Sequence, residues 1–515
     1  MHSERSFLAR RGVRISLAAL ASLAAMLVFA TGALAHKGVE HVFIVSQSAP
    51  PEGPLPPNVA YFTTIQAAVN ATAANEYDWI LVEPGVYDEE VKVTAAHAGI
   101  HIRGMNRNGV ILDGQGKAAP GGSNGILVEK ANEVWIENMT ARNYDRETPD
   151  GGNGNAFWWS GGDGSGKEGA HGWWGKYLTA YDTTLNGGYG IFAQNEKEGS
   201  WEHIYASGYN DSGIYIGACW ECKAKVNDAT IEDNAVGYSG SNSGGRLVIE
   251  NSIFRNNSAG IVPNGENPGD GPPPSNGMCD AKKPSRKKPY HLFTSTNIAR
   301  CEIFRKNLIT ENNNLEAPAN GSTEVAPWGV GVELPGVMAT ETTENTITNN
   351  ASNGVLGFEY PNPYPPRECD AQEVKEAEEK HEGCTKTIYF QLSGNKVANN
   401  TFENNGTNGS SEYNSQITLQ GGIFPYRKFT SDNNCVSGNT FLGTTTTWPN
   451  KIEERWGCQN NTTPPPGNGP GALEYIEQLS EESVVFRHAK AGVEPPPQET
   501  MPNPCENVPT NPLCP

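Results

Sequence analysis

An internal repeat of about 23 residues in the middle of the chain constrains the fold more than any other feature. Each copy has an asparagine, a glycine three or four residues later, and then a short run of β-forming residues. The clearest copies are NGGYGIFAQ (186–194), NDSGIYIG (210–217), NAVGYSGS (234–241) and NSAGIVPN (257–264). The repeat glycines are Gly190, Gly213, Gly237 and Gly260. A repeat of this length indicates a solenoid, in which each copy must stack on its neighbours to bury its apolar side.

The segments within and between these copies alternate β-branched or aromatic residues with polar ones, as in EHIYASG, DATIEDN and NSIFRNN. A helical repeat would instead place apolar residues at intervals near 3.6. About 23 residues with three short strands suit one rung of a right-handed parallel β-helix, with rungs roughly 4.8 Å apart. We therefore predict an all-β fold, a right-handed parallel β-helix. The repeat asparagines should stack as a ladder inside the coil; they are Asn186, Asn210, Asn234 and Asn257.

Two segments near the front resemble the opening of the pectate-lyase-like β-helix proteins. They are TIQAAVNATAANEYDWILVEPGVYDEEVKV (64–93) and GIHIRGMNRNGVILDG (99–114). The resemblance covers roughly residues 60–460 with interruptions. It implies an N-terminal amphipathic helix that caps the open end of the coil, with Ile65, Ala68 and Val69 on its apolar face. This fold hosts lyases, hydrolases, esterases, epimerases and non-enzymes, so the resemblance does not select an activity.

The first 35 residues have the pattern of an export signal. A basic stretch up to Arg14 precedes an apolar run, Ile15 to Ala30, and Ala33-Leu34-Ala35 is a small-x-small cleavage site. We expect a secreted chain that begins at His36 and is not attached to a membrane after cleavage. The β-helix should span 36–460. A Pro-rich C-terminal segment, 461–515, should carry one helix and hold the rest of its length loosely.

The chain has a formal net charge of −20. Such a charge argues against nucleic acid, because phosphate binding needs a basic patch. It also argues against polyanionic sugars unless a divalent cation bridges the charges. The expected partner is a polysaccharide or cell-surface glycan, and we expect a monomer. No cofactor is predicted, and no motif supports a bound calcium ion or another metal.

The ten cysteines all follow the signal segment. An even number in an exported chain favours disulfides between neighbouring pairs. Cys219-x-x-Cys222 also fits half of a zinc site or a redox pair. A zinc site needs four ligands and a thioredoxin-like site needs a βαβ context, and neither accompanies this motif, so a disulfide is favoured over free thiols. The predicted disulfide cysteines are Cys219, Cys222, Cys279, Cys301, Cys369, Cys384, Cys435, Cys458, Cys505 and Cys514.

Three segments should leave the coil as loops, at about 145–177, 264–300 and 361–387. The first is Gly-rich and carries two pairs of adjacent tryptophans, the second is Pro-rich and then basic, and the third contains a helical stretch. Insertions in a solenoid often lie over its binding face. The exposed rings of the tryptophans would then stack on sugar rings. The alternative is that the tryptophans fill a small core within the insertion.

In the mannuronan epimerases of the pectate-lyase-like superfamily, catalytic residues lie on the strand that opens with the repeat glycine, in a Tyr-Gly-Phe-Asp-Pro-His motif. Here GYGIFAQN (188–195) keeps Tyr-Gly and lacks Asp-Pro-His. The signatures of polygalacturonases are also missing. The resemblance therefore assigns no catalytic residue.

Side chains alternate along a strand, so if Ile191 points into the coil, its neighbour Phe192 points out. We predict that a glycan crosses the rungs on this outward column beneath the tryptophan-rich loop. The predicted substrate-binding residues are Phe192, Gln194, Tyr215, Trp173, Trp174 and Asn264.

Asp211 lies in the turn before Gly213, beside this column, and is the first candidate for proton transfer. His203 and Asp182 are further catalytic candidates, although each of the three also fits an ordinary solvated turn or strand residue. Two functions stay open. One is a polysaccharide lyase or glycoside hydrolase, and the other is a non-catalytic glycan-binding or surface structural β-helix protein.

Overall fold

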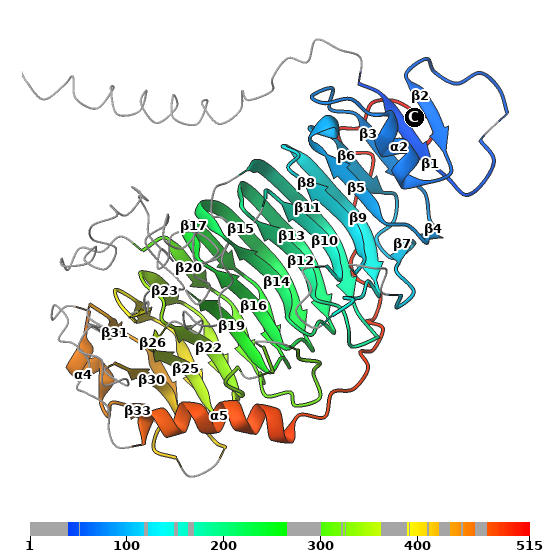
Figure 1. Cartoon of the computed structure of the whole chain (residues 1–515). Helices are drawn as coiled ribbons and strands as arrows, with labels where there is room; N and C mark the ends of the chain where they lie inside the picture. Colours follow the sequence, from blue (N-terminus) through cyan, green and yellow to red (C-terminus); the bar gives the residue numbers. More distant parts are fainter. Residues whose placement is uncertain are drawn as a thin grey trace, which may run out of the picture. The chain divides into compact units, whose positions relative to one another are not determined.

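Parallel strands stacked rung upon rung form the fold (Figure 1). The computed structural model describes residues 40–50, 52–117, 122–148, 153–162, 169–264, 300–320, 323–324, 326–361, 389–390, 392–408, 411–421, 433–443, 446–458 and 471–515. The expected signal segment, and nearly all of the expected insertions at 264–300 and 361–387, lie outside these residues. All the strands and helices below belong to one unit, His41–Pro515.

One face of the coil is a sheet of 11 strands, here called sheet B, in which every pairing is parallel. In spatial order its strands are β5 (Val91–Thr94), β8 (Asn124–Glu129), β10 (Asn155–Ser160), β12 (Tyr189–Gln194), β14 (Ser212–Gly217), β16 (Val236–Ser241), β19 (Ala259–Asn264), β22 (Val330–Pro335), β25 (Asn353–Phe358), β30 (Ser415–Gln420) and β33 (Thr447–Trp448).

The other faces belong to a connected sheet of 20 parallel strands, here called sheet A. Its strands are β1 (Val42–Val45), β2 (Val59–Phe62), β3 (Trp79–Val82), β4 (Gly85–Tyr87), β6 (His101–Gly104), β7 (Val110–Asp113), β9 (Val134–Arg142), β11 (Ala170–Tyr181), β13 (Glu196–Ser207), β15 (Cys219–Glu232), β17 (Ser243–Glu250), β18 (Ile253–Arg255), β20 (Glu302–Arg305), β21 (Leu308–Thr310), β23 (Thr340–Thr343), β24 (Thr346–Thr348), β28 (Lys396–Ala398), β29 (Thr401–Glu403), β31 (Cys435–Ser437) and β32 (Thr440–Leu442). The remaining elements are an antiparallel pair, β26 (Tyr360–Pro361) with β27 (Tyr389–Phe390), a 3-10 turn η1 (Ala95–His97), and the helices α2 (Ile65–Ala71), α4 (Ile452–Trp456) and α5 (Ala472–Phe486).

The long strands of sheet A turn a corner at a residue with left-handed backbone. In β13 this residue is His203, with φ of 54°, and in β15 it is Asp228, with φ of 56°. Each such strand therefore covers two sides of the coil, and the strand of sheet B covers the third. The predicted right-handed parallel β-helix with three strands per rung is confirmed.

The repeat glycine marks the place where successive rungs approach most closely. A methyl group at Gly190 would lie 2.5 Å from the carbonyl oxygen of Gly213, and one at Gly237 would lie 2.5 Å from that of Gly260. The same contact recurs further along at Gly331, which faces the carbonyl oxygen of Gly354. A side chain would crowd that carbonyl group, which favours glycine in most of these rungs, although Ala156 and Gln416 stand at the matching positions of β10 and β30.

Buried asparagines link the rungs inside the coil, as predicted. The Nδ2 of Asn234 donates to Oδ1 of Asn257 at 3.0 Å, and Asn257 donates in the same way to Asn312 at 3.0 Å. The ladder continues through Asn350 and Asn405, and all its members are at most 2% exposed. Each Oδ1 also accepts a backbone N–H of the neighbouring rung, so each amide bonds along the stack.

The ladder differs from the prediction at its start. Asn186 is exposed, and Asn210 donates instead to the carbonyl oxygen of Leu185 at 3.0 Å. The first asparagine of the ladder is therefore Asn234. Its amide oxygen accepts the backbone N–H of Tyr209, which lies in the preceding rung beside Asn210. The two asparagines upstream therefore shape turns and do not extend the ladder.

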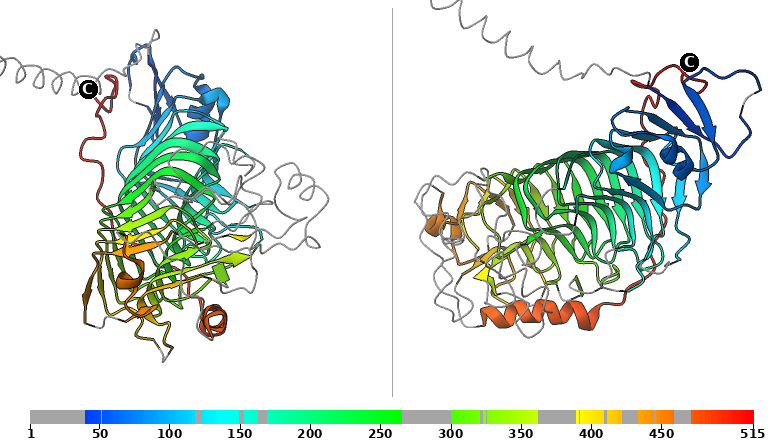
Figure 2. Two further views of the ribbon diagram at one scale, coloured as in Figure 1. Left: turned by 90° about the vertical axis from the view of Figure 1, so that its left-hand side faces the viewer. Right: turned by 45° about the horizontal axis from the view of Figure 1, so that its top comes forward.

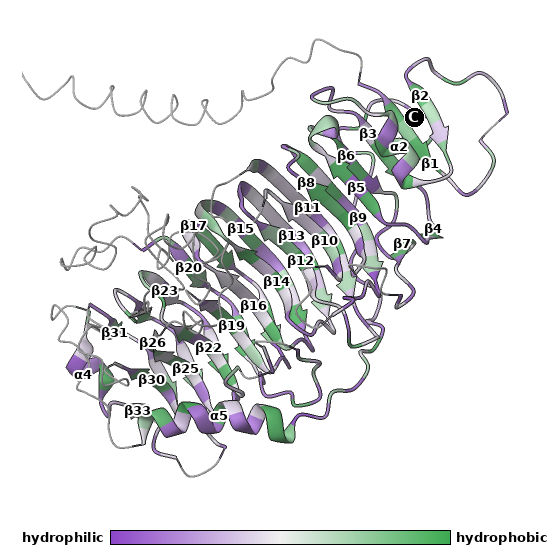
Figure 3. Ribbon diagram, in the orientation of Figure 1, coloured by the Kyte–Doolittle hydropathy of each residue, from purple (hydrophilic) through white to green (hydrophobic). Residues whose placement is uncertain are grey.

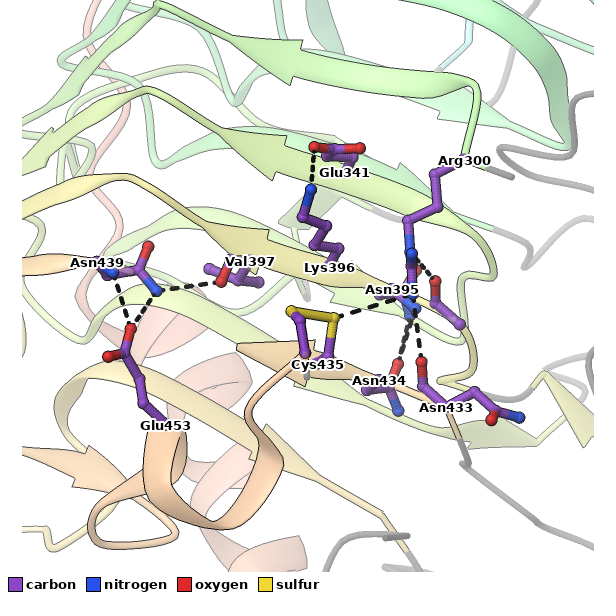
Figure 4. The surroundings of a disulfide bond; sticks show 12 residues. Arg300, Glu341, Asn395, Lys396, Val397, Asn433, Asn434, Cys435, Asn439 and Glu453 are labelled. Atoms are coloured by element: carbon purple, nitrogen blue, oxygen red, sulfur yellow. Dashed lines mark hydrogen bonds and ion pairs between the residues drawn. A yellow bond between two sulfur atoms is a disulfide. The ribbon is translucent and has the colours of Figure 1, made fainter. Parts of the chain in front are cut away.

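A second ladder runs through the adjacent corner. Asn345 donates to Asn400 at 2.9 Å and Asn400 to Asn439 at 3.0 Å. Asn439, the last member of this ladder, donates its Nδ2 to the carboxylate oxygen Oε1 of Glu453 in α4 at 2.8 Å (Figure 4). Helix α4 therefore satisfies the polar end of the stack.

Helix α2 covers the N-terminal end with the predicted face inward, since Ile65, Ala68 and Val69 are fully buried. Thr64 caps its first turn by accepting the N–H of Ala67. The carboxylate of Glu89 accepts the N–H groups of Ile65 and Gln66, each at 3.0 Å. Figure 3 shows that the neighbouring strands β5, β8 and β9 are rich in hydrophobic residues, which continue the core beneath this cap.

The expected insertion at about 145–177 is wrong in two stretches. Residues Asn155–Ser160 and Ala170–Tyr181 are the coil strands β10 and β11. Trp173 is completely buried in the core, with its ring 4.8 Å from that of Trp201. Neighbouring residues on a strand point to opposite sides, so one tryptophan of each adjacent pair fills the coil.

Three of the predicted disulfides are present. Cys219 bonds Cys222, Cys435 bonds Cys458 (Figure 4), and Cys505 bonds Cys514. Cys301 is also disulfide-bonded. The Cys219–Cys222 bond rules out the zinc and free-thiol alternatives for that motif. The remaining cysteines, Cys279, Cys369 and Cys384, lie outside the described residues.

Helix α5 packs against the outer face of sheet B at the C-terminal end (Figure 2). The predicted helix therefore exists and ends at Phe486. Its residues Tyr475 and Leu479 form a buried cluster with Leu356 and Phe358 of the sheet. Within the described part of the chain, no helix is both long and apolar enough to span a bilayer.

The segment after α5, residues 487–515, is firmly docked, so the prediction of a loose tail is wrong. It runs back along the coil to the N-terminal rungs (Figures 1 and 2). We call it the strap. The backbone N–H of Lys490 donates to Glu316 O at 2.9 Å, and that of Met501 donates to Asn138 Oδ1 at 2.8 Å. The first acceptor is a backbone carbonyl oxygen and the second is the side chain of a buried asparagine. Specific hydrogen bonds therefore hold the Pro-rich strap on the coil.

Buried arginines of the first rungs hold the end of the strap. Arg107 donates to Glu499 O at 2.9 Å, and Arg103 donates to Pro504 O at 3.1 Å and Glu506 O at 2.7 Å. The loop closed by the last disulfide adds Cys514 to a hydrophobic cluster with β1 and β3. The strap thus covers the apolar outer side of the N-terminal rungs.

Removing residues 503–515 should lower the melting temperature and expose this cluster, because Trp79 and Leu81 would face solvent and Arg103 would lose two acceptors. Hydrogen exchange should accelerate in β1, β2 and β3 and stay slow in β14 and β16. Unchanged protection of β1 to β3 would contradict a clamping role for the strap.

Candidate functional site

An aromatic column lies on the outer face of sheet B. Trp158, Phe192 and Tyr215 occupy paired positions on β10, β12 and β14. Trp158 stacks on Phe192 at 5.2 Å between ring centroids, and Phe192 meets Tyr215 edge-on at 4.8 Å. Their strand neighbours Ile191 and Ile214 lie in the coil core. The predicted side-chain register is therefore correct.

The column is more covered than the sequence suggests. Phe192 and Tyr215 are each only 5% exposed. Trp158 and Gln194 are partly exposed, as is Asn264 at the end of β19. The indole N–H of Trp158 is buried and has no hydrogen-bond partner within the described structure, so the exposed part of this side chain is ring carbon. Trp158, one of the four tryptophans expected to stack on sugar rings but not one of the six predicted binding residues, is therefore the ring of this column best placed to meet a ligand.

A charged group lies where the turns enter sheet B. Arg146 pairs with Asp211, Nη2 to Oδ2 at 3.2 Å, and its guanidinium lies 5.1 Å from the ring of Tyr189. Gly188 makes room for the arginine, since a side chain there would collide with the guanidinium. Three consecutive rungs thus bring a cation, a carboxylate and a phenol to the edge of the aromatic column. Tyr189 packs on Phe192 at 4.5 Å, which joins the two features.

The environment favours the neutral phenol of Tyr189. Burial raises its pKa well above the usual value, and the negative charge of Asp211 raises it further, whereas Arg146 lowers it. At neutral pH, Tyr189 is therefore a proton donor. Asp211 faces a guanidinium rather than further carboxylates, so this group does not offer the oxygen ligands that calcium prefers.

Asp182 is a buried turn residue, 1% exposed. Its carboxylate accepts the N–H of Gly187 at 3.1 Å and lies 2.8 Å from the hydroxyl of Thr184, which also contacts Asp145 at 2.5 Å. Burial raises the pKa of Asp182 to about 6, and hydrogen bonds from Thr184 and Gly187 limit the rise. These contacts hold the turn, and the carboxyl does not reach the surface.

His203 lies at a different corner of the coil from Asp211, within β13. Its Nδ1 pairs with Asp228 at 2.6 Å, and its ring stacks on Tyr177 at 4.5 Å. The structure therefore does not unite the three predicted catalytic residues.

Trp174 lies on the outer face of sheet A. It ends a stack of rings along successive rungs, with Trp135 at 6.2 Å, and its indole N–H donates to Glu133 at 3.1 Å. Trp79 and His101 continue the stack, each ring about parallel to the next. The predicted tryptophan lid over Phe192 and Tyr215 is therefore wrong, because Trp173 points into the coil and Trp174 faces another side.

Sequence reasoning did not single out Arg146 and Tyr189, and it included Trp158 only among the four tryptophans expected to stack on sugar rings. Arg146 and Trp158 lie in the stretch 145–177, which was expected to leave the coil and so was not counted in the repeat. Tyr189 directly precedes the repeat glycine, and its ring packs against the outward rings of Phe192 and Tyr215. Extending the repeat upstream from Gly190 would have drawn attention to Arg146 and Trp158, whereas Tyr189 already lay in the recognised copy 186–194.

The raised pKa of Asp182 predicts a pH-dependent stability. The carboxyl releases its proton near pH 3.8 in the unfolded chain and at about pH 6 in the folded one. Its contribution is thus fully present below pH 3.8 and is lost as pH rises through 6. The stability of wild type relative to Asp182→Asn should fall across this window by on the order of 3 kcal/mol. Chemical unfolding at a series of pH values measures this; a flat difference would contradict the assignment.

A model of a family described as a protein of unknown function (DUF1565) matches residues 315–469. No curated protein sequence matches the chain. Among solved structures, the A-module of Azotobacter vinelandii mannuronan C-5 epimerase AlgE4 is 14% identical with a TM-score of 0.41, covering 74% of this chain and 91% of that one.

An alginate lyase from Paenibacillus sp. FPU-7 is 11% identical with a TM-score of 0.36, covering 74% and 94% of the two chains. The pectin methylesterase PemA from Erwinia chrysanthemi is 14% identical with a TM-score of 0.32, covering 74% and 93%. These likenesses concern the fold. The chain itself has a right-handed parallel β-helix fold.

Proposed function

We propose that this is an exported protein that binds a polysaccharide across the rungs of sheet B and acts on it as a lyase. The observation that carries the proposal is the charged group Arg146, Tyr189 and Asp211 at the edge of the aromatic column. Outward side chains repeat at the rung spacing of about 4.8 Å, which suits an extended glycan lying across several rungs. The disulfides are consistent with an exported chain.

The side chains proposed to contact the glycan are those of the column that remain partly exposed. The partly exposed ring of Trp158 can stack on a sugar. Gln194 at the end of β12 and Asn264 at the end of β19 add amide groups to the same sheet. Phe192 and Tyr215 support Trp158 and Tyr189 from behind, because they are nearly buried.

The chemistry follows from the pairing of groups. Glycoside hydrolysis usually needs two carboxyl groups on either side of the scissile bond. Here Asp211 faces Arg146 and Tyr189 instead. A carboxylate that takes a proton α to a carbonyl, a guanidinium that stabilises the resulting anion, and a phenol that protonates the departing glycosidic oxygen together suit an elimination. The substrate class is a polysaccharide with uronic acid residues, preferably esterified, since the chain itself carries net charge −20.

A non-catalytic glycan-binding protein is the second candidate. The observation that favours it is that Asp211 is already neutralised by Arg146 and lies in a mostly buried pair, with side chains 15% and 5% exposed. Under this function the pair would fix the turn into sheet B, and Trp158 would provide the binding contact.

The lyase and the non-catalytic binding protein can be distinguished by measuring binding and product release on a panel of neutral, esterified and acidic polysaccharides. Trp158→Ala should weaken binding about tenfold through the lost stacking, near 1.4 kcal/mol. Asp211→Asn should keep binding and reduce the release of unsaturated products at least 100-fold. His203→Asn is the control, because His203 occupies another corner and asparagine tolerates its left-handed backbone.

Binding without unsaturated products for any polysaccharide would refute the lyase and leave the second candidate. Equal effects of Trp158→Ala and His203→Asn on binding would contradict the placement of the glycan on sheet B.

A further inference from the structure

Three side chains from two separate segments converge at the N-terminal edge of sheet A. His41 directly precedes β1, and Asp78 directly precedes β3. Glu76 lies in the loop that leads to Asp78. Among the residues that the structure describes, they form a group of histidine and two carboxylates with one ligand atom each, all within 4.8 Å of one another.

The backbone fixes two of these residues in place. Strands β1 and β3 pair in parallel register with Val42 opposite Trp79, and the N–H of Trp79 donates to the carbonyl oxygen of His41 at 2.9 Å. Asp78 accepts the backbone N–H of His41 at 3.1 Å. The carboxylate of Asp78 is 1% exposed, whereas the side chains of His41 and Glu76 are 42% and 52% exposed. The group is therefore anchored on its inner side and open to solvent on its outer side.

The geometry points to a binding site for a divalent transition-type cation such as Zn²⁺, held by His41, Glu76 and Asp78. His41 Nδ1 lies 3.1 Å from Asp78 Oδ1 and 3.8 Å from Glu76 Oε2. Ligands about 2.0–2.2 Å from a tetrahedral zinc ion lie roughly 3.4 Å from one another, so the observed separations need only small side-chain shifts. One imidazole with two carboxylates suits zinc, whereas calcium prefers six or more oxygen ligands. This site lies apart from the group on sheet B and does not depend on the proposed function.

Two of the other histidine–carboxylate pairs provide the comparison. His171 lies 3.7 Å from Glu133 and is 43% exposed, close to the exposure of His41. His203 pairs with Asp228 at 2.6 Å. Neither pair has a third ligand within the described residues. If His41 merely formed a hydrogen bond with Asp78, it would resemble these pairs and show no preference for a metal ion.

The experiment uses the full mature chain after treatment with a chelator, titrated with ZnCl₂ by calorimetry and checked by metal analysis. One zinc ion should bind per chain and raise the melting temperature. His41→Ala and Asp78→Asn should each weaken zinc binding at least tenfold, and His171→Ala should leave it unchanged. CaCl₂ should give no comparable shift.

Glu76→Gln supplies the same test if Asp78→Asn fails to fold, because Glu76 is exposed and its replacement is nearly isosteric. Absence of stoichiometric zinc in the wild-type chain would overturn the site. Zinc binding that survives both His41→Ala and Glu76→Gln, or that is lost in His171→Ala, would overturn it as well.

Discussion

The close stacking of one rung upon the next is the constraint on which the rest of this structure depends. Backbone hydrogen bonds between parallel strands hold the rungs, and the buried amides of Asn234, Asn257 and Asn312 add a second set of bonds at the corner. An unpaired amide in the core would be costly, so each member requires the next. The repeat glycines permit the approach that these bonds require. The asparagine hydrogen bonds and the close approach at the repeat glycines thus both require the same repeat length along the sequence.

The same spacing places the candidate site. Because rungs are in register, residues far apart in sequence such as Arg146 and Asp211 meet at one turn, and Trp158 lies beside Phe192 on the adjoining sheet. The coil supplies a rigid surface, and the turns supply charge. Helix α5 and the strap then cover other parts of the outer surface with apolar contacts and hydrogen bonds, which restricts where a ligand can lie.

The sequence predicted the fold well and the site only in part. Periodicity captures what every rung must repeat, so Gly190, Gly213 and the buried asparagines indicated the coil, and the alternation placed Phe192 and Tyr215 outward. The sequence periodicity carries little information on contacts that occur at a single place in the structure and do not repeat from rung to rung. Whether Asp211 meets Arg146 depends on turn conformations, and the docking of the strap depends on buried Arg103 and Arg107, which no local pattern of the Pro-rich tail reveals.

The most direct test of this account is the free energy of unfolding of Asn312→Ala. Asn312 is completely buried and bonds both Asn257 and Asn350. Its removal should cost about 3 kcal/mol, because a donor and an acceptor are left unpaired within the coil. The exposed Asn70 of α2 serves as a control, and Asn70→Ala should change stability by less than about 0.5 kcal/mol. Equal, small effects of the two substitutions would contradict the central role of the ladder.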